Sequence, residues 1–153
     1  MRGAVAFDHR GVKLRERTLE EVQRLGHEPV DLGTDKSEPP VDYPDKAREV
    51  GEAIRNGDAE RGILVCGSGV GAAIAACKLR GVRAAICHDT YSAHQGVEHD
   101  DMNVLTLGSR VIGPEPAFEC AVAFLGASFS GEPRHRRRLG KVLAIEASSD
   151  RSD

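Results

Sequence analysis

One thiol stands between an apolar run and a turn that contains three glycines, in the stretch Gly62-Ile63-Leu64-Val65-Cys66-Gly67-Ser68-Gly69-Val70-Gly71. This pattern predicts a buried strand that ends at Cys66. The following residues favour a helix, whose unpaired N–H groups should point toward whatever binds beside the thiol. A helix N-terminus also favours thiolate, which makes Cys66 a candidate base near neutral pH. A buried small residue before a glycine-rich turn is the structural alternative.

A second polar pair, Asp8-His9, directly follows an earlier apolar run. In a parallel sheet with the flavodoxin-like order 2-1-3-4-5, the carboxyl ends of the first and third strands meet at the switch point, where ligands bind. A carboxylate, an imidazole, the Cys66 thiol and the Ser68 hydroxyl then share one crevice. Asp8 alone is compatible with an N-cap and His9 with a loop, but their coincidence with Cys66 favours a site.

A third polar segment, from Glu98 to Asn103, enters the last predicted strand. We expect its His99 and Asp100 to approach the same edge of the sheet, where His99 can transfer protons near neutral pH. In isolation the segment is more typical of a solvated connection than of a site. Arg110 leaves that strand at its carboxyl end and is placed to bind an anion.

A basic cluster covers residues 134–138, with the sequence Arg-His-Arg-Arg-Arg. It is compatible with a solvated helix face, a nucleic-acid patch or a phosphate clamp. Arg134 and Arg138 are four residues apart and share one helix face, and paired guanidiniums bind phosphate well. A nucleic-acid surface requires more basic residues in register, aromatic residues or a recognised motif. This argues against the nucleic-acid patch and leaves the solvated helix face and the phosphate clamp as alternatives.

Composition limits the class of protein further. The chain has 153 residues, 4% aromatic residues and a net charge of −3. This length fits one domain, predicted over residues 1–147 with a frayed tail at 148–153. The balanced charge argues against bulk binding to nucleic acid or to an anionic membrane surface. We expect a small-molecule partner.

Cysteine usage and hydropathy indicate the compartment. The four cysteines, Cys66, Cys77, Cys87 and Cys120, include no CxxC pair and are typical of a reduced, intracellular protein. No apolar run approaches the ~20 residues of a membrane span, and Asp8-His9-Arg10 interrupts any signal-peptide pattern. We expect a cytoplasmic protein. A zinc site built from Cys66 with His88, His94 or His99 matches no familiar ligand spacing.

Short apolar runs alternate with amphipathic ones along the chain. Strands are predicted at 4–7, 28–32, 62–66, 82–87 and 103–107, and helices at 12–25, 44–56, 71–79, 90–98 and 114–125. This alternation predicts a doubly wound, Rossmann-like α/β fold, in which a five-stranded parallel sheet of order 2-1-3-4-5 lies between two helix layers. An extra C-terminal helix carries the apolar stripe Leu139, Val142 and Leu143. Either a second subunit or the chain's own sheet is compatible with that stripe.

Several motifs follow one another along the chain: Ala6-Phe7-Asp8-His9, Asp42-Tyr43-Pro44, Cys66-Gly67-Ser68-Gly69-Val70-Gly71, His99-Asp100-Asp101 with Asn103-Val104-Leu105, Gly108-Ser109-Arg110, and Arg134-His135 with Arg138. In this order they resemble the ribose-5-phosphate isomerase B family, which also contains the galactose-6-phosphate isomerase subunits. The resemblance covers nearly the whole chain. It is more specific to the family than to a substrate.

The resemblance implies an aldose–ketose isomerase that acts through a cis-enediol without metal or cofactor. By resemblance, Cys66 moves a proton between C2 and C1, Ser68 handles protons on the sugar oxygens, and His99 with Asp8 opens the sugar ring. The backbone around Gly67, Gly69, Val70 and Gly71 is similar to the family's oxyanion site. His9, Arg110, Arg134 and Arg138 are similar to the phosphate-binding residues. Family sites form between two subunits, which implies a homodimer or a dimer of dimers.

The chain departs from the family pattern at three places. Asp100 stands where many relatives have Asn, so an acceptor replaces an amide donor that could steady an enediolate. Ala72 and Ala73 leave no carboxylate in the helix where some relatives use a Glu base, and Cys66 must serve alone. Cys77 replaces a frequent Asn, and the sequence offers no physical account of that change.

D-ribose 5-phosphate and D-ribulose 5-phosphate are the first candidate substrates. A tetrose or hexose phosphate, such as galactose 6-phosphate, is the alternative within the class. A weakly active phosphosugar-binding partner subunit is the alternative outside it, and Asp100 is the feature that motivates it. A nucleotide-binding module is disfavoured because the turn after Cys66 is neither a P-loop with its Lys nor a Rossmann fingerprint.

Overall fold

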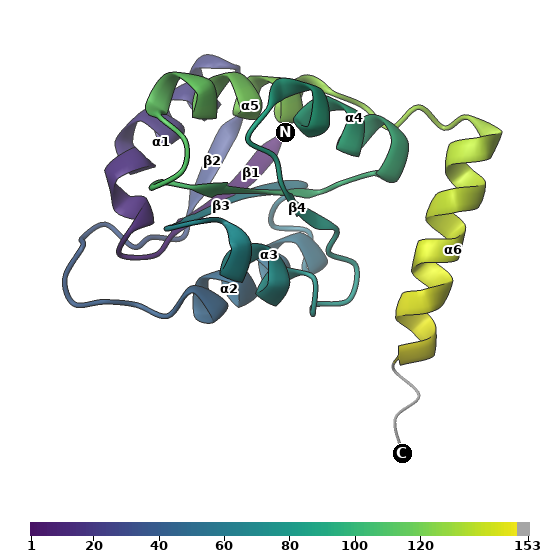
Figure 1. The fold of residues 1–153 in the computed structure, drawn as a ribbon, viewed down its shortest axis with the longest axis horizontal. Helices are drawn as coiled ribbons and strands as arrows, with labels where there is room; N and C mark the ends of the chain where they lie inside the picture. The colour runs from purple at the N-terminus through teal and green to yellow at the C-terminus, as the bar shows by residue number, and fades with distance from the viewer. Residues whose placement is uncertain (150–153) are drawn as a thin grey trace.

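The computed structural model of the protein describes residues 1–149. A parallel sheet of five strands lies at its centre and carries helices on both faces (Figure 1). The strands are β1 (Arg2–Phe7), β2 (Glu28–Asp31), β3 (Arg61–Cys66), β4 (Ala84–Ile86) and β5 (Val104–Gly108). The doubly wound, three-layer α/β class predicted from the alternation of short apolar and amphipathic runs is confirmed.

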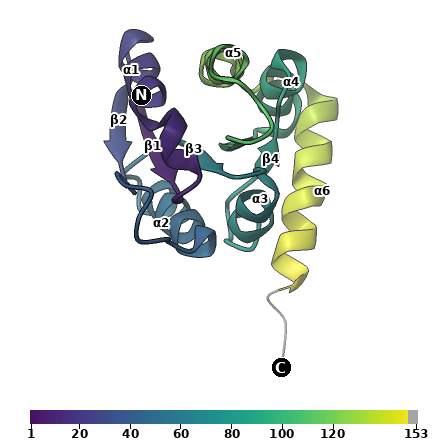
Figure 2. The same ribbon diagram turned by 60° about the vertical axis from the view of Figure 1, so that its left-hand side comes forward.

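The helices divide between the two faces of the sheet (Figures 1 and 2). They are the short 3-10 helix η1 (Gly11–Leu14), α1 (Arg15–Arg24), α2 (Tyr43–Arg55), α3 (Val70–Ala76), α4 (Thr90–Asp100), α5 (Pro114–Gly126) and α6 (Pro133–Ser149). Helices α1, α4 and α5 cover one face, where Val5 and Phe7 of β1 lie in the core. Helices α2 and α3 cover the other, where Ala4 and Ala6 lie. Because successive side chains of a strand point to opposite faces of the sheet, the strands contribute to two separate hydrophobic cores.

The strand order is β2-β1-β3-β5-β4, so the predicted order 2-1-3-4-5 is wrong for the last two strands. All five residues of β5 are buried, and this strand lies between two neighbours. Strand β4 has three partly exposed residues and forms the edge. The chain crosses from β3 to the edge through α3 and returns through α4 on the opposite face, as right-handed crossovers require. Cys66 at the end of β3 is therefore in register with Gly108 at the end of β5.

Helix α6 lies outside the two helix layers, beside α4 (Figures 1 and 2). Its only buried side chain is His135, and Val142, Leu143 and Ile145 are 48%, 40% and 70% exposed. Near its far end, Glu146 accepts a hydrogen bond from the Gly81 N–H at 2.9 Å. The helix also includes Ser148 and Ser149, which the sequence assigned to a frayed tail, while residues 150–153 of that tail lie outside the described residues.

None of the helices described within residues 1–149 is both long enough and apolar enough to cross a membrane.

Arg61, the first residue of β3, donates hydrogen bonds to carbonyls at the C-terminal end of α5. Its guanidinium donates to the carbonyls of Phe124 at 2.6 Å, Leu125 at 3.3 Å and Ala127 at 2.7 Å. A cation at this position also complements the helix dipole. Arg61 therefore connects the central sheet to the helix layer that covers β5.

We expect Arg61→Met to lower the free energy of unfolding by about 2 kcal/mol, because it leaves partly buried carbonyls without a charged donor. Urea denaturation measures the change. Arg55→Met, at the exposed end of α2, is the matched control and should unfold as the unmodified protein does. Equal midpoints for all three proteins would contradict the anchoring role of Arg61.

Candidate active site

A cleft of about 330 Å³ opens at the carboxyl ends of β1, β3 and β5. Its lining residues come from the turns after these strands and from the start of α2: Asp8, Arg10, Tyr43, Cys66, Gly67, Ser68, Gly71, Arg110 and Val111. The first and third strands are adjacent, as predicted, and their turns meet at the switch point of the sheet. The predicted convergence of Asp8, Cys66 and Ser68 is therefore present.

Cys66 ends β3 and its side chain is 4% exposed. The Gly69 N–H donates to its Sγ at 3.1 Å. Gly69 has a φ of +82°, which directs this N–H back toward the thiol at the start of α3. The Ser68 hydroxyl accepts from the Val70 N–H at 3.2 Å and is exposed to the cleft. The turn thus supplies one backbone N–H to the sulfur and places the Ser68 hydroxyl beside it in the cleft.

The Asp8 side chain accepts backbone hydrogen bonds and also lines the cleft. It is 4% exposed, and its Oδ1 accepts from the N–H groups of Arg10 at 2.9 Å and Gly11 at 2.8 Å. The N-cap position of η1 is Arg10 rather than Asp8, so Asp8 holds the turn before the helix and is not its N-cap. The same side chain also lines the cleft, so its structural role in this turn and a functional role are compatible.

Backbone contacts join the end of β5 to the turn after β3. The Ser109 N–H donates to the Cys66 carbonyl at 2.8 Å, and the Arg110 N–H donates to the Gly67 carbonyl at 3.0 Å. A Cβ atom at Gly108 would lie 2.5 Å from the backbone of Ser68, so only glycine permits this approach. These contacts set the position of Cys66 relative to Arg110.

His88, which the sequence offered only as a zinc ligand without a familiar spacing, instead contacts the backbone at the end of β5. It lies just beyond β4, and its Nε2 accepts from the Gly108 N–H at 2.9 Å. Burial lowers the pKa of His88, and nearby Asp89 partly opposes that shift. The neutral ring is the form that can accept this N–H. A polar residue at the carboxyl end of a strand was the available signal.

Arg10, Tyr43 and Val111 also line the cleft without having been predicted as site residues. The Tyr43 ring packs so closely over Gly71 that a Cβ there would lie 2.6 Å from the ring. The tyrosine was noted only as part of a motif, and its direction depends on the loop that precedes α2. Arg10 directly follows Asp8-His9, so its place after a strand was the signal for it.

Three predicted binding residues sit around the cleft rather than in its lining. His9 is bonded through Nδ1 to the backbone of Val41, with distances of 3.1 Å to the carbonyl and 3.3 Å to the N–H. Gly69 contributes the N–H that reaches Cys66, and Val70 begins α3 with its side chain 47% exposed. Gly67 and Gly71 line the cleft as predicted.

The predicted approach of His99 to the same edge is wrong. His99 lies near the end of α4, which leads into the amino end of β5, whereas the cleft lies at the carboxyl ends. A residue that enters a parallel strand is on the opposite edge from one that leaves it. His99 instead contacts Gln95 through Nδ1 at 2.9 Å and stacks on His135 with ring centroids 4.0 Å apart.

Arg134 and Arg138 lie on α6, beside the His99 region rather than the cleft. Both are exposed, and the Nε of Arg134 pairs with Glu132 at 3.1 Å. His135 lies between them in the sequence and is buried. It is hydrogen-bonded to Ser130 at 2.5 Å, and its ring stacks on His99. The chain therefore holds its predicted site residues in two separate groups.

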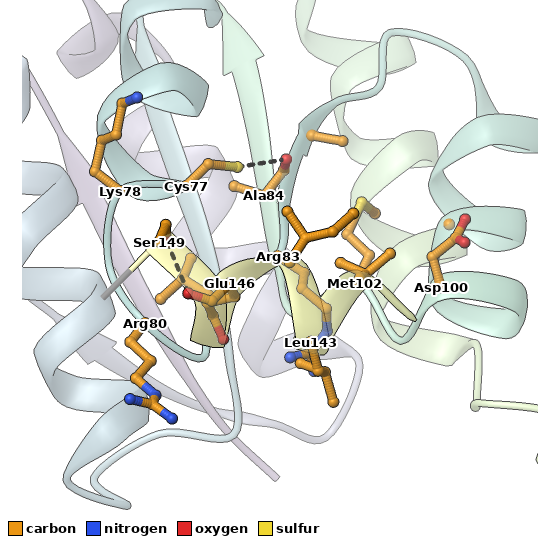
Figure 3. Close-up of a pocket in the computed structure, with 15 residues that line it drawn as sticks. Cys77, Lys78, Arg80, Arg83, Ala84, Asp100, Met102, Leu143, Glu146 and Ser149 are labelled. Atoms are coloured by element: carbon orange, nitrogen blue, oxygen red, sulfur yellow. Dashed lines mark hydrogen bonds between the residues drawn. The ribbon is translucent and has the colours of Figure 1, made fainter. Parts of the chain in front are cut away.

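Asp100 lines a different and larger cavity, of about 660 Å³, between α6 and the β4 side of the sheet (Figure 3). Cys77, Arg83 and Met102 lie in its wall, and Leu143 and Glu146 of α6 close it (Figure 3). The Cys77 thiol donates to the Ala84 carbonyl at 3.2 Å. Among residues 1–149, no group of three or more His, Cys, Asp or Glu side chains is arranged to hold a metal ion.

Comparisons with known proteins agree on one family. A family profile described as Ribose/Galactose Isomerase matches residues 4–142. Ribose-5-phosphate isomerase B of Escherichia coli (strain K12) is 43% identical over 143 residues, which cover 94% of this chain and 95% of that protein. D-erythrulose-4-phosphate isomerase of Pectobacterium atrosepticum is 42% identical over 129 residues, or 84% of each chain. The structure of Clostridium thermocellum ribose-5-phosphate isomerase B superposes with a TM-score of 0.93 at 40% identity, covering 97% of this chain and 99% of that one.

We expect the free energy of unfolding to fall as the pH drops from 7.5 to 5.5. Burial lowers the pKa values of His27, His88 and His135 below the ordinary value of about 6.5. The unfolded chain then binds more protons than the folded one, so the stability present above pH 6.5 is lost as the pH falls below it. Urea midpoints at the two pH values measure the loss.

His88→Gln tests the share of His88, because Gln can accept the Gly108 N–H but does not titrate. This variant should lose less stability over the same pH range than the unmodified protein. His94→Gln, which removes an exposed imidazole bonded to Glu98 at 2.8 Å, is the control and should not reduce the loss. Identical pH dependence in the unmodified protein and His88→Gln would show that the His88 ring is not held neutral.

Proposed function

Because the chain belongs to the ribose/galactose isomerase family and is a sugar-phosphate isomerase of the aldose–ketose type, we propose that it interconverts D-ribose 5-phosphate and D-ribulose 5-phosphate. The observation that carries the proposal is the thiol of Cys66, which ends β3 in the cleft and receives the Gly69 N–H at 3.1 Å. Such an arrangement places a sulfur base where charge on the substrate can be stabilised by backbone donors.

In the proposed reaction, the Cys66 thiolate removes the proton from C2 of the open-chain aldose. The C–H electron pair forms the C1–C2 double bond, and O1 takes up a proton, which gives the cis-enediol. Loss of the O2 proton and return of a proton from Cys66 to C1 complete the ketose. Ser68, exposed beside the thiol, handles the protons on O1 and O2, and the backbone of residues 67–71 stabilises the enediolate. The proposed reaction uses neither metal nor cofactor.

We propose that the complete site forms between two copies of the chain, as a homodimer or a dimer of dimers. Cys66, Ser68 and Asp8 from one copy then meet His99, Arg134 and Arg138 from the other. The separation of these two groups within one chain supports this arrangement. The exposed apolar face of α6 supports it as well, because such a face is typical of an interface. His99 opens the sugar ring, and the arginines, with His9 and Arg110, hold the phosphate.

A tetrose phosphate is the second candidate substrate, because a 42% identical relative carries the name D-erythrulose-4-phosphate isomerase. Asp100 bears on the choice through the proposed shared site, where it would come from the second copy beside His99. A carboxylate near an enediolate raises its energy where an amide would donate a hydrogen bond. Assays on four-, five- and six-carbon sugar phosphates decide between the candidates. The protein should show its highest kcat/KM on ribose 5-phosphate, and a higher value on a tetrose or hexose phosphate would overturn that choice.

Replacing Cys66 should remove most of the isomerisation without unfolding the protein. We expect Cys66→Ser to lower kcat by about 10²–10⁴, because loss of a general base typically costs that much. Measurement of kcat alongside urea unfolding separates catalysis from stability. Cys77→Ser, an exposed thiol away from the cleft, is the matched control and should retain activity. Turnover of Cys66→Ser at the unmodified rate would rule out the thiol base.

Mixed dimers test whether the site is shared. Cys66→Ala and His99→Asn should each be nearly inactive alone, whereas mixing and refolding them together should restore about a quarter of the unmodified activity. Half of the dimers are then hybrids, and one of the two sites in each hybrid is intact if its residues come from different chains. If both residues act in one chain's site, every site in the mixture carries a defect. Activity that stays absent would contradict the shared site.

A further inference from the structure

Two arginines, Arg10 and Arg110, line the cleft that contains Cys66. Within residues 1–149, neither side chain has a hydrogen-bond or ion-pair partner, although Arg15, Arg24 and Arg83 all pair with carboxylates. The Asp8 carboxylate also lines the cleft, but its Oδ1 already accepts two backbone N–H groups. Two like charges facing one cleft favour an anion between them.

The backbone of Arg10 is fixed from both sides. Its N–H donates to Asp8 Oδ1 at 2.9 Å, and its carbonyl accepts from the Ser109 hydroxyl at 2.6 Å. Asp8 and Ser109 are each only 4% exposed. Because both partners are buried, the direction in which the Arg10 side chain leaves the backbone is fixed as well.

The Arg10 side chain lies over Gly67, beside the thiol. A Cβ atom at Gly67 would lie 3.0 Å from Arg10 Cδ and 3.5 Å from its Nη1. The glycine therefore leaves room for the arginine stem next to the Cys66 turn. Arg110 reaches the same turn from β5, where its N–H donates to the Gly67 carbonyl at 3.0 Å. Both arginines thus contact the turn at Gly67, Arg10 through its side chain and Arg110 through its backbone.

We propose that Arg10 is a further phosphate-binding residue, which acts beside Arg110 and strengthens the binding of the phosphorylated substrate. This proposal rests on the proposed function for the identity of the substrate, but not for the binding of phosphate itself. Guanidinium is the side chain that best matches phosphate oxygens, because its planar fork donates two parallel hydrogen bonds. Arg10 comes from the same chain as Cys66, so it holds the phosphate at a fixed distance from the base.

Binding of inorganic phosphate, measured by titration calorimetry on the unmodified protein and its variants, tests the pair directly. Arg10→Met keeps the apolar stem and the backbone contacts but removes the charge, and should weaken phosphate binding about ten- to hundredfold. Arg55 is at the end of α2 that lies away from the cleft. Arg55→Met is therefore the matched control and should bind phosphate as the unmodified protein does. Urea unfolding should give equal midpoints for all of these proteins.

Three calorimetric outcomes would overturn the proposal. They are undiminished phosphate binding by Arg10→Met, equal weakening in Arg10→Met and Arg55→Met, and no measurable phosphate binding by the unmodified protein. Arg10→Lys should recover only part of the affinity, since an ammonium cannot donate two parallel bonds. Full recovery with Lys would overturn the bidentate geometry.

Kinetics separate this proposal from the proposed function. Arg10→Met should raise KM for ribose 5-phosphate about ten- to hundredfold with little change in kcat, because ground-state and transition-state binding of phosphate are equal. A fall in kcat with unchanged KM would overturn a phosphate role for Arg10. If the unmodified protein isomerises no sugar phosphate, the proposed function fails, whereas loss of phosphate binding in Arg10→Met still supports the anion pair.

Discussion

The close approach of two backbones, at Gly108 and Ser68, is the constraint on which the site depends. Strand β5 must lie directly beside β3, and residue 108 must have no side chain, since a Cβ there would come within 2.5 Å of the Ser68 backbone. Only then can the N–H groups of Ser109 and Arg110 reach the carbonyls of Cys66 and Gly67. The turn that carries the thiol is thereby held by hydrogen bonds to the neighbouring strand end rather than by its own short sequence.

Buried and partly buried polar side chains also hold the turn after β3 and the end of β5 through hydrogen bonds. The buried Thr106 hydroxyl donates to the Gly69 carbonyl at 3.0 Å, and His88 accepts the Gly108 N–H. Gly69 in turn directs its N–H at the thiol. A base needs a fixed position more than it needs many contacts, because displacement of about 1 Å can cost a large part of the rate. The hydrogen bonds around residues 66–69 serve that requirement.

Much of this molecule could be predicted from the sequence, and the failures have physical causes. Strong two-sided apolar runs identified the five strands, and the switch-point rule brought Asp8 to Cys66. The order of β4 and β5 failed because both runs are apolar, and the run of residues 82–87 did not reveal that only Ala84–Ile86 would form a strand. Arg10 and Tyr43 were missed as site residues because their directions depend on hydrogen bonds and packing between segments distant in sequence.

The wrong prediction for His99 bears on how the complete site is assembled. His99 precedes β5 and Arg110 follows it, so the length of the strand, roughly 16 Å for five residues, separates their backbones. No rotation of side chains closes that distance, and moving α4 to the other edge would break the strand that holds the Cys66 turn. His99 and Cys66 of one chain therefore lie at opposite edges of the sheet, and this separation is the observation that supports the proposed site between two copies. In the proposed dimer, the second copy would also bury the exposed apolar face of α6. The same assembly would therefore complete the site and cover this helix.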